Sequence, residues 1–141
     1  MGWIERTVLV IAVAAACETS QPRFTEPMVL GGVTVDAATL ERGQRVFMLR
    51  CATCHGARGD GKGPSARTLA RPPADLTRGV YPATVGGEDR LPTDDELRTR
   101  ILRGLPERGM PPFTYLDPGD LDAVVQFLKT LAPAWHGQGP T

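Results

Sequence analysis

Residues 51–55 read Cys51-Ala52-Thr53-Cys54-His55, two cysteines separated by two residues and followed directly by a histidine. This spacing is typical of a c-type haem attachment site, in which each thiol adds to one vinyl group of the porphyrin. His55 is then held under the iron and can donate an imidazole nitrogen as the proximal ligand. The motif therefore predicts one covalently bound haem c.

Two other kinds of site share part of this pattern. A Cys-x-x-Cys pair also occurs in thioredoxin-like redox sites and in zinc sites. A thioredoxin-like pair lies at a strand-to-helix turn of an α/β fold, and no such pattern is found here. A zinc site needs about four ligands, and after Cys51, Cys54 and His55 only Cys17 and His136 are left, near the two ends of the chain. Both alternatives are therefore disfavoured.

The stretch Gly109-Met110-Pro111-Pro112-Phe113 supplies a candidate for the second axial ligand. A thioether is a soft ligand, and His/Met ligation raises the reduction potential of a haem. The two prolines fix φ and stiffen the backbone beside the sulfur. Methionines more often fill gaps in a core. Met48 nevertheless lies too close to Cys51 to reach the opposite haem face, and Met28 falls in an expected linker, which leaves Met110 as the predicted distal ligand.

These two motifs, together with the glycine-rich run 59–64, resemble a class I monohaem cytochrome c domain over roughly residues 36–132. The resemblance implies an all-α cytochrome c fold, with three to five short helices wrapped around one covalent haem c. In that family a proline carbonyl accepts the second N–H of the proximal histidine, and Pro64 is the candidate here. A glycine and an aromatic residue one turn later pack against the C-terminal helix, and Gly43 and Phe47 match that pair.

Helical periodicity and capping residues predict three longer helices. Asp36 can cap a helix from Ala37 to about Arg50, in which Gly43 needs a close helix crossing to offset its cost of about 1 kcal/mol. A second helix is expected from Thr93 or Asp94 to Arg103, ended by Gly104. The C-terminal helix is capped by Asp117 or Asp120 and stopped by Pro133, and its Phe127 is expected to meet Gly43. Its other apolar positions recur at helical spacing: Leu121, Val124, Val125, Leu128 and Leu131.

The N-terminus resembles an export signal. Residues 7–16 form an apolar run that is too short to span a membrane, and Ala14-Ala15-Ala16 supplies small residues for cleavage. We therefore expect a signal peptide at 1–16. Cys17 follows directly, as in a bacterial lipobox, so we expect it to be the lipidated first residue of the mature chain; cleavage elsewhere would leave a free thiol. The predicted location is periplasmic, with membrane association through this lipid.

The remaining segments are expected to be irregular. Residues 17–35 are predicted to be a flexible tether, although Val29, Leu30 and Val33 packing on the domain is an open alternative. Residues 133–141 are predicted to be a disordered tail, so a second iron ligand at His136 is not expected. Other side chains stay open: Tyr81 and Trp135 as haem-lining residues, and Arg67, Arg71 and Arg78 as partners of a propionate or as solvated surface residues.

The 141 residues are enough for one domain, and their formal net charge is zero. This balance gives no reason to expect nucleic-acid binding, and any steering of a redox partner has to come from local patches. We predict a non-catalytic one-electron carrier that exchanges electrons with a protein donor and acceptor. Two alternatives are a tethered subunit of a respiratory oxidase, reductase or dehydrogenase complex and, if Met110 does not ligate, a five-coordinate haem enzyme or gas sensor.

Overall fold

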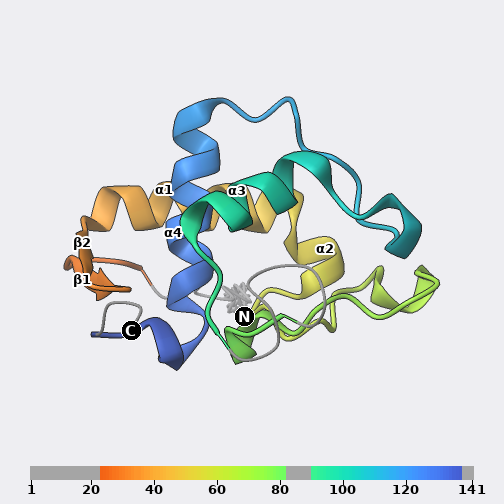
Figure 1. Cartoon of the computed structure of the whole chain (residues 1–141), viewed down its shortest axis with the longest axis horizontal. Helices are drawn as coiled ribbons and strands as arrows, with labels where there is room; N and C mark the ends of the chain where they lie inside the picture. Colours follow the sequence, from red (N-terminus) through yellow and green to blue (C-terminus); the bar gives the residue numbers. More distant parts are fainter. Residues whose placement is uncertain (1–22, 82–89, 138–141) are drawn as a thin grey trace, which may run out of the picture.

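The computed structural model describes residues 23–81 and 90–137, so the expected signal peptide, Cys17 and most of 133–141 beyond Gly137 lie outside the described residues. Four α-helices and a small hairpin form the fold (Figure 1), which confirms the predicted helical class and adds two short strands. The α-helices and strands are β1 (Met28–Leu30), β2 (Val33–Val35), α1 (Ala37–Arg50), α2 (Ala52–His55), α3 (Asp94–Arg103) and α4 (Pro118–Thr130). Four 3-10 turns lie between or after them: η1 (Ala66–Thr68), η2 (Leu76–Arg78), η3 (Pro106–Arg108) and η4 (Pro133–Trp135).

Helices α1 and α4 cross at the centre of the molecule (Figure 1). Gly43 makes the close approach possible, since a Cβ added there would overlap the Ala123 carbonyl oxygen and lie 2.7 Å from the Phe127 Cβ. One turn later, the ring of Phe47 packs against that of Phe127 with centroids 5.2 Å apart. The crossing predicted from Gly43 and Phe127 is thus confirmed, and both phenylalanines are almost completely buried.

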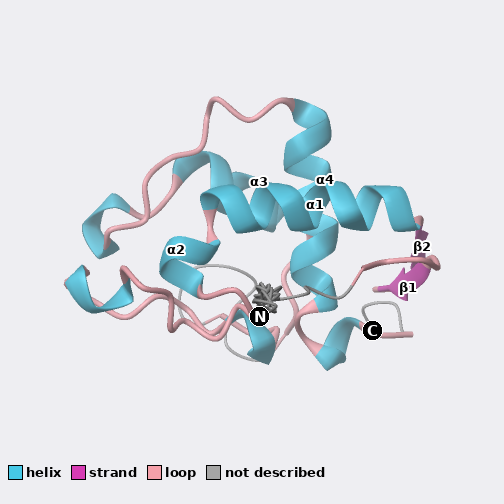
Figure 2. Ribbon diagram, turned by 180° about the vertical axis from the view of Figure 1, so that it is seen from behind, coloured by secondary structure: helices cyan, strands magenta, loops and turns pink. Residues whose placement is uncertain are grey.

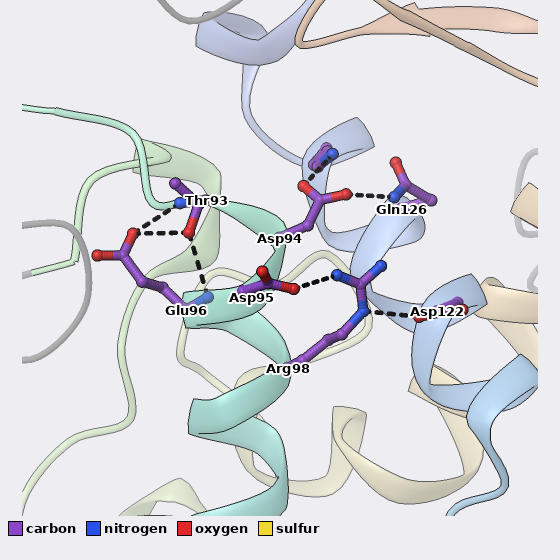
Figure 3. Close-up of polar contacts among 8 residues, drawn as sticks. Thr93, Asp94, Asp95, Glu96, Arg98, Asp122 and Gln126 are labelled. Carbon is purple, nitrogen blue, oxygen red and sulfur yellow. Dashed lines mark hydrogen bonds and ion pairs between the residues drawn. The ribbon is translucent and has the colours of Figure 1, made fainter.

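The predicted helix starts are confirmed by their caps. The Asp36 carboxylate accepts a hydrogen bond from the Thr39 N–H at 2.9 Å. At α3, Thr93 and Glu96 form a reciprocal capping box (Figure 3), which satisfies two backbone N–H groups at once. At α4 the cap is Asp117, whose carboxylate accepts from the Asp120 N–H at 3.0 Å. Each helix therefore begins where its sequence provides an acceptor.

Polar contacts join α3 to α4 across their solvent side (Figure 3). Arg98 of α3 donates to Asp122 of α4 at 2.6 Å. Asp94 accepts from Gln126 at 2.7 Å and also pairs with Lys129, whose side chain is buried. These contacts fix the helix that leads into the Met110 loop.

Residues 28–35 differ from the predicted flexible tether. They form an antiparallel hairpin in which Leu30 pairs with Val33, and Leu30 is completely buried. The start of the expected disordered tail is ordered too, because the Gly31 N–H donates to the Trp135 carbonyl at 2.8 Å and Trp135 is 3% exposed. The open alternative, local packing of this segment on the domain, holds for Leu30, whereas Val29 and Val33 remain substantially exposed.

Within the described ranges, no helix combines the length and apolar character needed to cross a membrane.

Candidate functional site

The haem-attachment motif lies where α1 passes into the one-turn helix α2. The Cys51 N–H donates to the Phe47 carbonyl at 2.8 Å, so it continues α1, and the His55 N–H donates to the Cys51 carbonyl at 2.9 Å. Cys54 and His55 thus stand on a single turn attached to the end of a helix that the core holds rigidly. The two thiols are free and partly buried.

The loop after α2 folds back onto its carbonyl groups. Hydrogen bonds run from the Gly61 N–H to the His55 carbonyl (2.8 Å), from Gly63 to Cys54 (3.0 Å) and from Ser65 to Thr53 (2.9 Å). A Cβ at Gly63 would lie only 2.6 Å from the Cys54 carbonyl oxygen and would overlap that of Thr53. The glycine-rich run therefore allows backbone to satisfy the end of α2, which would otherwise have unpaired carbonyls.

The Ala74 carbonyl orients His55. Its oxygen lies 3.1 Å from His55 Nδ1. A carbonyl only accepts, so Nδ1 carries the proton and Nε2 keeps the lone pair that a metal ligand needs. Burial lowers the pKa of His55, against the opposing effect of this hydrogen bond, so the ring stays neutral.

The prediction that Pro64 supplies this carbonyl is wrong. Pro64 is exposed and stands between Gly63 and Ser65, both of which donate to carbonyls of α2. The backbone there is committed to the end of the helix, and the chain comes back to the imidazole only at Ala74. No local sequence signal identifies Ala74, because any residue has a carbonyl and the contact joins segments 19 residues apart.

The thiol of Cys51 is held in its protonated form. Burial, and then the neighbouring Cys54, raise the pKa of Cys51 to about 12. The apolar surroundings that disfavour a thiolate suit a thioether, which carries no charge and needs no hydrogen-bond partner.

Met110 lies at the end of a short closed loop after α3. Leu105 and Met110 exchange two backbone hydrogen bonds, at 2.8 and 3.1 Å, and η3 forms the turn between them. Gly109 closes the turn with φ of +90°, a left-handed conformation that favours glycine. The Phe113 N–H donates to the Ile101 carbonyl at 3.1 Å, which ties the far side of the loop back to α3. The thioether is thus carried on a stiff, clamped segment.

The Met110 loop and α2 are linked through η1. A Cβ at Gly109 would lie 2.9 Å from Leu69 Cδ2, so the loop contacts the residue that ends η1. The same stretch joins α2 through the hydrogen bond from Ser65 to Thr53. Helix α2 and η3 consequently lie toward the same end of the molecule in both ribbon views (Figures 1 and 2).

The side chains left open by the sequence have different environments. Tyr81 is 6% exposed and donates to the Leu76 carbonyl at 3.4 Å, at the end of the loop that follows α2. Trp135 lies against Gly31 and under Lys129, whose Nζ is 5.2 Å from the ring centroid. Arg67 and Arg71 are exposed.

These residues fit a covalent haem. Two uncharged thiols stand one turn apart on α2, and a neutral imidazole is oriented by a backbone carbonyl and keeps Nε2 available. Thiols that add to vinyl groups and a His nitrogen are the donor set that a c-type haem requires. When bound, the haem supplies one-electron chemistry at its iron, and the chain contributes attachment and orientation of the ligand.

Comparison with known proteins agrees with this site. The cytochrome c family model matches residues 40–132. A solved chain from the reducing HAO-like protein complex of Kuenenia stuttgartiensis is 33% identical, with a TM-score of 0.64, over 71% of this chain and 46% of that one. No curated protein sequence matches. The chain belongs to the cytochrome c family, in which Cys51 and Cys54 have the spacing that holds one covalent haem c.

Proposed function

We propose that this cytochrome is a one-electron carrier whose haem has His55 and Met110 as its two axial ligands. The observation that carries the proposal is the hydrogen bond from His55 Nδ1 to the Ala74 carbonyl at 3.1 Å, which leaves Nε2 as the ligand atom. Met110 supports it, because its loop is clamped at both ends and joined through Leu69 to the segment that packs on α2. With both axial positions filled, no coordination site remains for a substrate.

Optical spectra of the holoprotein test this ligation. The chain is produced with the c-type maturation machinery, and the oxidised protein is expected to show the charge-transfer band of an Fe(III)–thioether bond. Met110→Ala should abolish the band and let the reduced protein bind carbon monoxide. Met28→Ala, a methionine of β1, is the matched control and should keep the band. Rapid carbon monoxide binding by the unchanged protein would instead mean an open distal site and a ligand-binding or catalytic haem.

We also propose that the protein is exported to the periplasm and tethered to a membrane by a lipid on Cys17. The support is the apolar run 7–16 followed by Ala14-Ala15-Ala16-Cys17, and an odd cysteine in an exported chain needs such an explanation. Cys17→Ser should move the holoprotein from the membrane fraction to the soluble periplasmic fraction. Unchanged membrane association would contradict lipid anchoring.

A second function, as the cytochrome subunit of a larger oxidoreductase complex, is favoured by one observation. The similar solved chain is part of a complex, and the matched region is 46% of its length. Purification of the tagged protein from its native membrane under mild conditions separates the two. A stoichiometric partner with its own redox centre would identify a subunit, and a monomer would identify a free carrier.

A further inference from the structure

A cluster of unpaired positive charge surrounds the haem-attachment motif, although the whole chain has a formal charge of zero. Residues 45–71 contain six basic side chains and one acidic one, Asp60. All six basic residues are exposed: Arg45, Arg50, Arg58, Lys62, Arg67 and Arg71. In Figure 1 this stretch is the yellow to yellow-green part of the chain, which includes the end of α1, all of α2 and η1.

The ion pairs of the molecule lie elsewhere. Among the described residues, none of the six makes a salt bridge. Asp117 and Asp120 pair with Arg42, and Asp95 and Asp122 pair with Arg98 (Figure 3). Acidic side chains of α3 and α4 are therefore neutralised internally, whereas the positive charge near α2 remains available to an outside partner.

Exposed apolar side chains adjoin the same charges. Leu49 is 75% exposed on the last turn of α1, two residues before Cys51. Tyr115 is 61% exposed and follows the Met110 loop. The Arg50 guanidinium lies 5.4 Å from the Tyr115 ring centroid, which joins the two segments on the surface. We call these two residues and the six basic ones the basic attachment face.

We propose that the basic attachment face docks a protein redox partner whose surface carries clustered Asp and Glu carboxylates, with Leu49 and Tyr115 as apolar anchors. Opposite charges steer such an encounter and fix its orientation. Exposed leucine and tyrosine side chains at its centre supply contact area that excludes water. An anionic membrane would be attracted by the charges as well, but the tyrosine held under Arg50 beside the attachment motif favours a protein contact.

This inference rests on the proposed electron-transfer function, so binding is tested first and without electron transfer. The reduced, diamagnetic holoprotein is labelled with ¹⁵N and titrated with a hexaglutamate peptide at low salt. Amide shifts are expected at residues 45–71 and at Tyr115. Arg45→Glu/Arg58→Glu should abolish them, whereas Arg23→Glu/Arg103→Glu, with the same charge change on other exposed sites, should keep them. Shifts centred on α3 and α4, or equal losses in both variants, would overturn the proposal.

Electron transfer is tested next with two small probes of opposite charge. Each oxidises the haem iron from Fe(II) to Fe(III) by one electron: ferricyanide, which becomes ferrocyanide, and tris(phenanthroline)cobalt(III), which becomes its cobalt(II) form. Arg45→Glu/Arg58→Glu should slow the reaction with ferricyanide about tenfold at low ionic strength and accelerate that with the cobalt complex. The Arg23→Glu/Arg103→Glu control should change either rate by less than about twofold. Equal effects of the two variants would show that only net charge matters and would overturn the proposal.

Sedimentation with phosphatidylglycerol vesicles decides between a protein and a membrane. The docking proposal expects little binding of the holoprotein lacking the Cys17 lipid at physiological salt. Strong vesicle binding that Arg45→Glu/Arg58→Glu removes would assign the face to a lipid surface and overturn the protein partner. Failure of the axial-ligand spectra, with hexaglutamate shifts intact, would refute the proposed carrier function and leave the docking face standing.

Discussion

The α1–α4 crossing and the segment of residues 56–81, here called the cradle, are held together by different means. The crossing buries large apolar side chains such as Phe47, Val124 and Phe127. In the cradle the only large side chains that are buried are Leu76 and Tyr81, and the other buried positions are glycines. Its shape depends instead on backbone hydrogen bonds to α2 and on one contact from His55 to Ala74.

This difference indicates which part of the fold depends on the haem. Apolar burial contributes about 25 cal/mol for each Å² removed from water, so the crossing can be stable by itself. Backbone hydrogen bonds contribute little net free energy each and have to offset the entropy of ordering a long loop. We therefore expect the crossing to persist without haem and the cradle to need the large apolar surface of the bound group.

The largest expected effect is on the crossing, and it does not depend on haem. Gly43→Ala should lower the free energy of unfolding by about 3 kcal/mol, because the added methyl group overlaps the Ala123 carbonyl and presses on Phe127. The loss should appear in the holoprotein and in the chain produced without haem attachment, measured by urea unfolding followed by circular dichroism.

Arg45→Ala, an exposed position of the same helix, is the control and should stay within about 0.5 kcal/mol of the unchanged protein. A Gly43→Ala effect confined to the holoprotein would mean that the crossing is itself assembled by the haem.

Much of the helical frame is predictable from the sequence because its determinants are local. Asp36, Thr93 and Asp117 are acceptors that precede helical patterns, and each caps a helix in the structure. The role of Gly43 follows from its poor helix propensity within an otherwise regular pattern. These signals lie within one or two turns of the residue they affect, so a single sequence is sufficient to detect them.

The contacts that escape prediction join distant segments through the backbone. The Ala74 carbonyl has no signature in its side chain, and Pro64, the nearer candidate, is turned away by hydrogen bonds to α2. The hairpin 28–35 has strands of three residues, too short for a period-two pattern to be read. Its order comes from Trp135, more than a hundred residues away in sequence.

A smaller effect is expected on the cradle at alkaline pH. Burial, and then the charge of Asp75, raise the pKa of Tyr81 to about 12 from its ordinary value of 10.0. Above pH 10 the unfolded tyrosine releases its proton and the folded one keeps it, so the folded state binds more protons and stability falls as the pH rises. The loss should reach about 2–3 kcal/mol near pH 12.

Urea unfolding of the holoprotein between pH 8 and 11.5 measures this loss. Tyr81→Phe should flatten the curve, whereas Tyr115→Phe, which replaces an exposed ring, should leave the pH dependence unchanged. An identical curve for Tyr81→Phe would show that the phenol is solvated in the folded protein.

The smallest effect separates the two regions most directly. Gly63→Ala places a methyl group among the carbonyls of Ala52, Thr53 and Cys54, where the loop packs on α2. We expect a loss of about 2 kcal/mol in the holoprotein, because the loop has to move off α2 and weaken the backbone hydrogen bonds there. In the chain without haem the loss should be close to zero, since a cradle that is not formed cannot be strained. Equal losses in both forms would show that the cradle folds before the haem is attached, and the division between a self-sufficient crossing and a haem-dependent cradle would then fail.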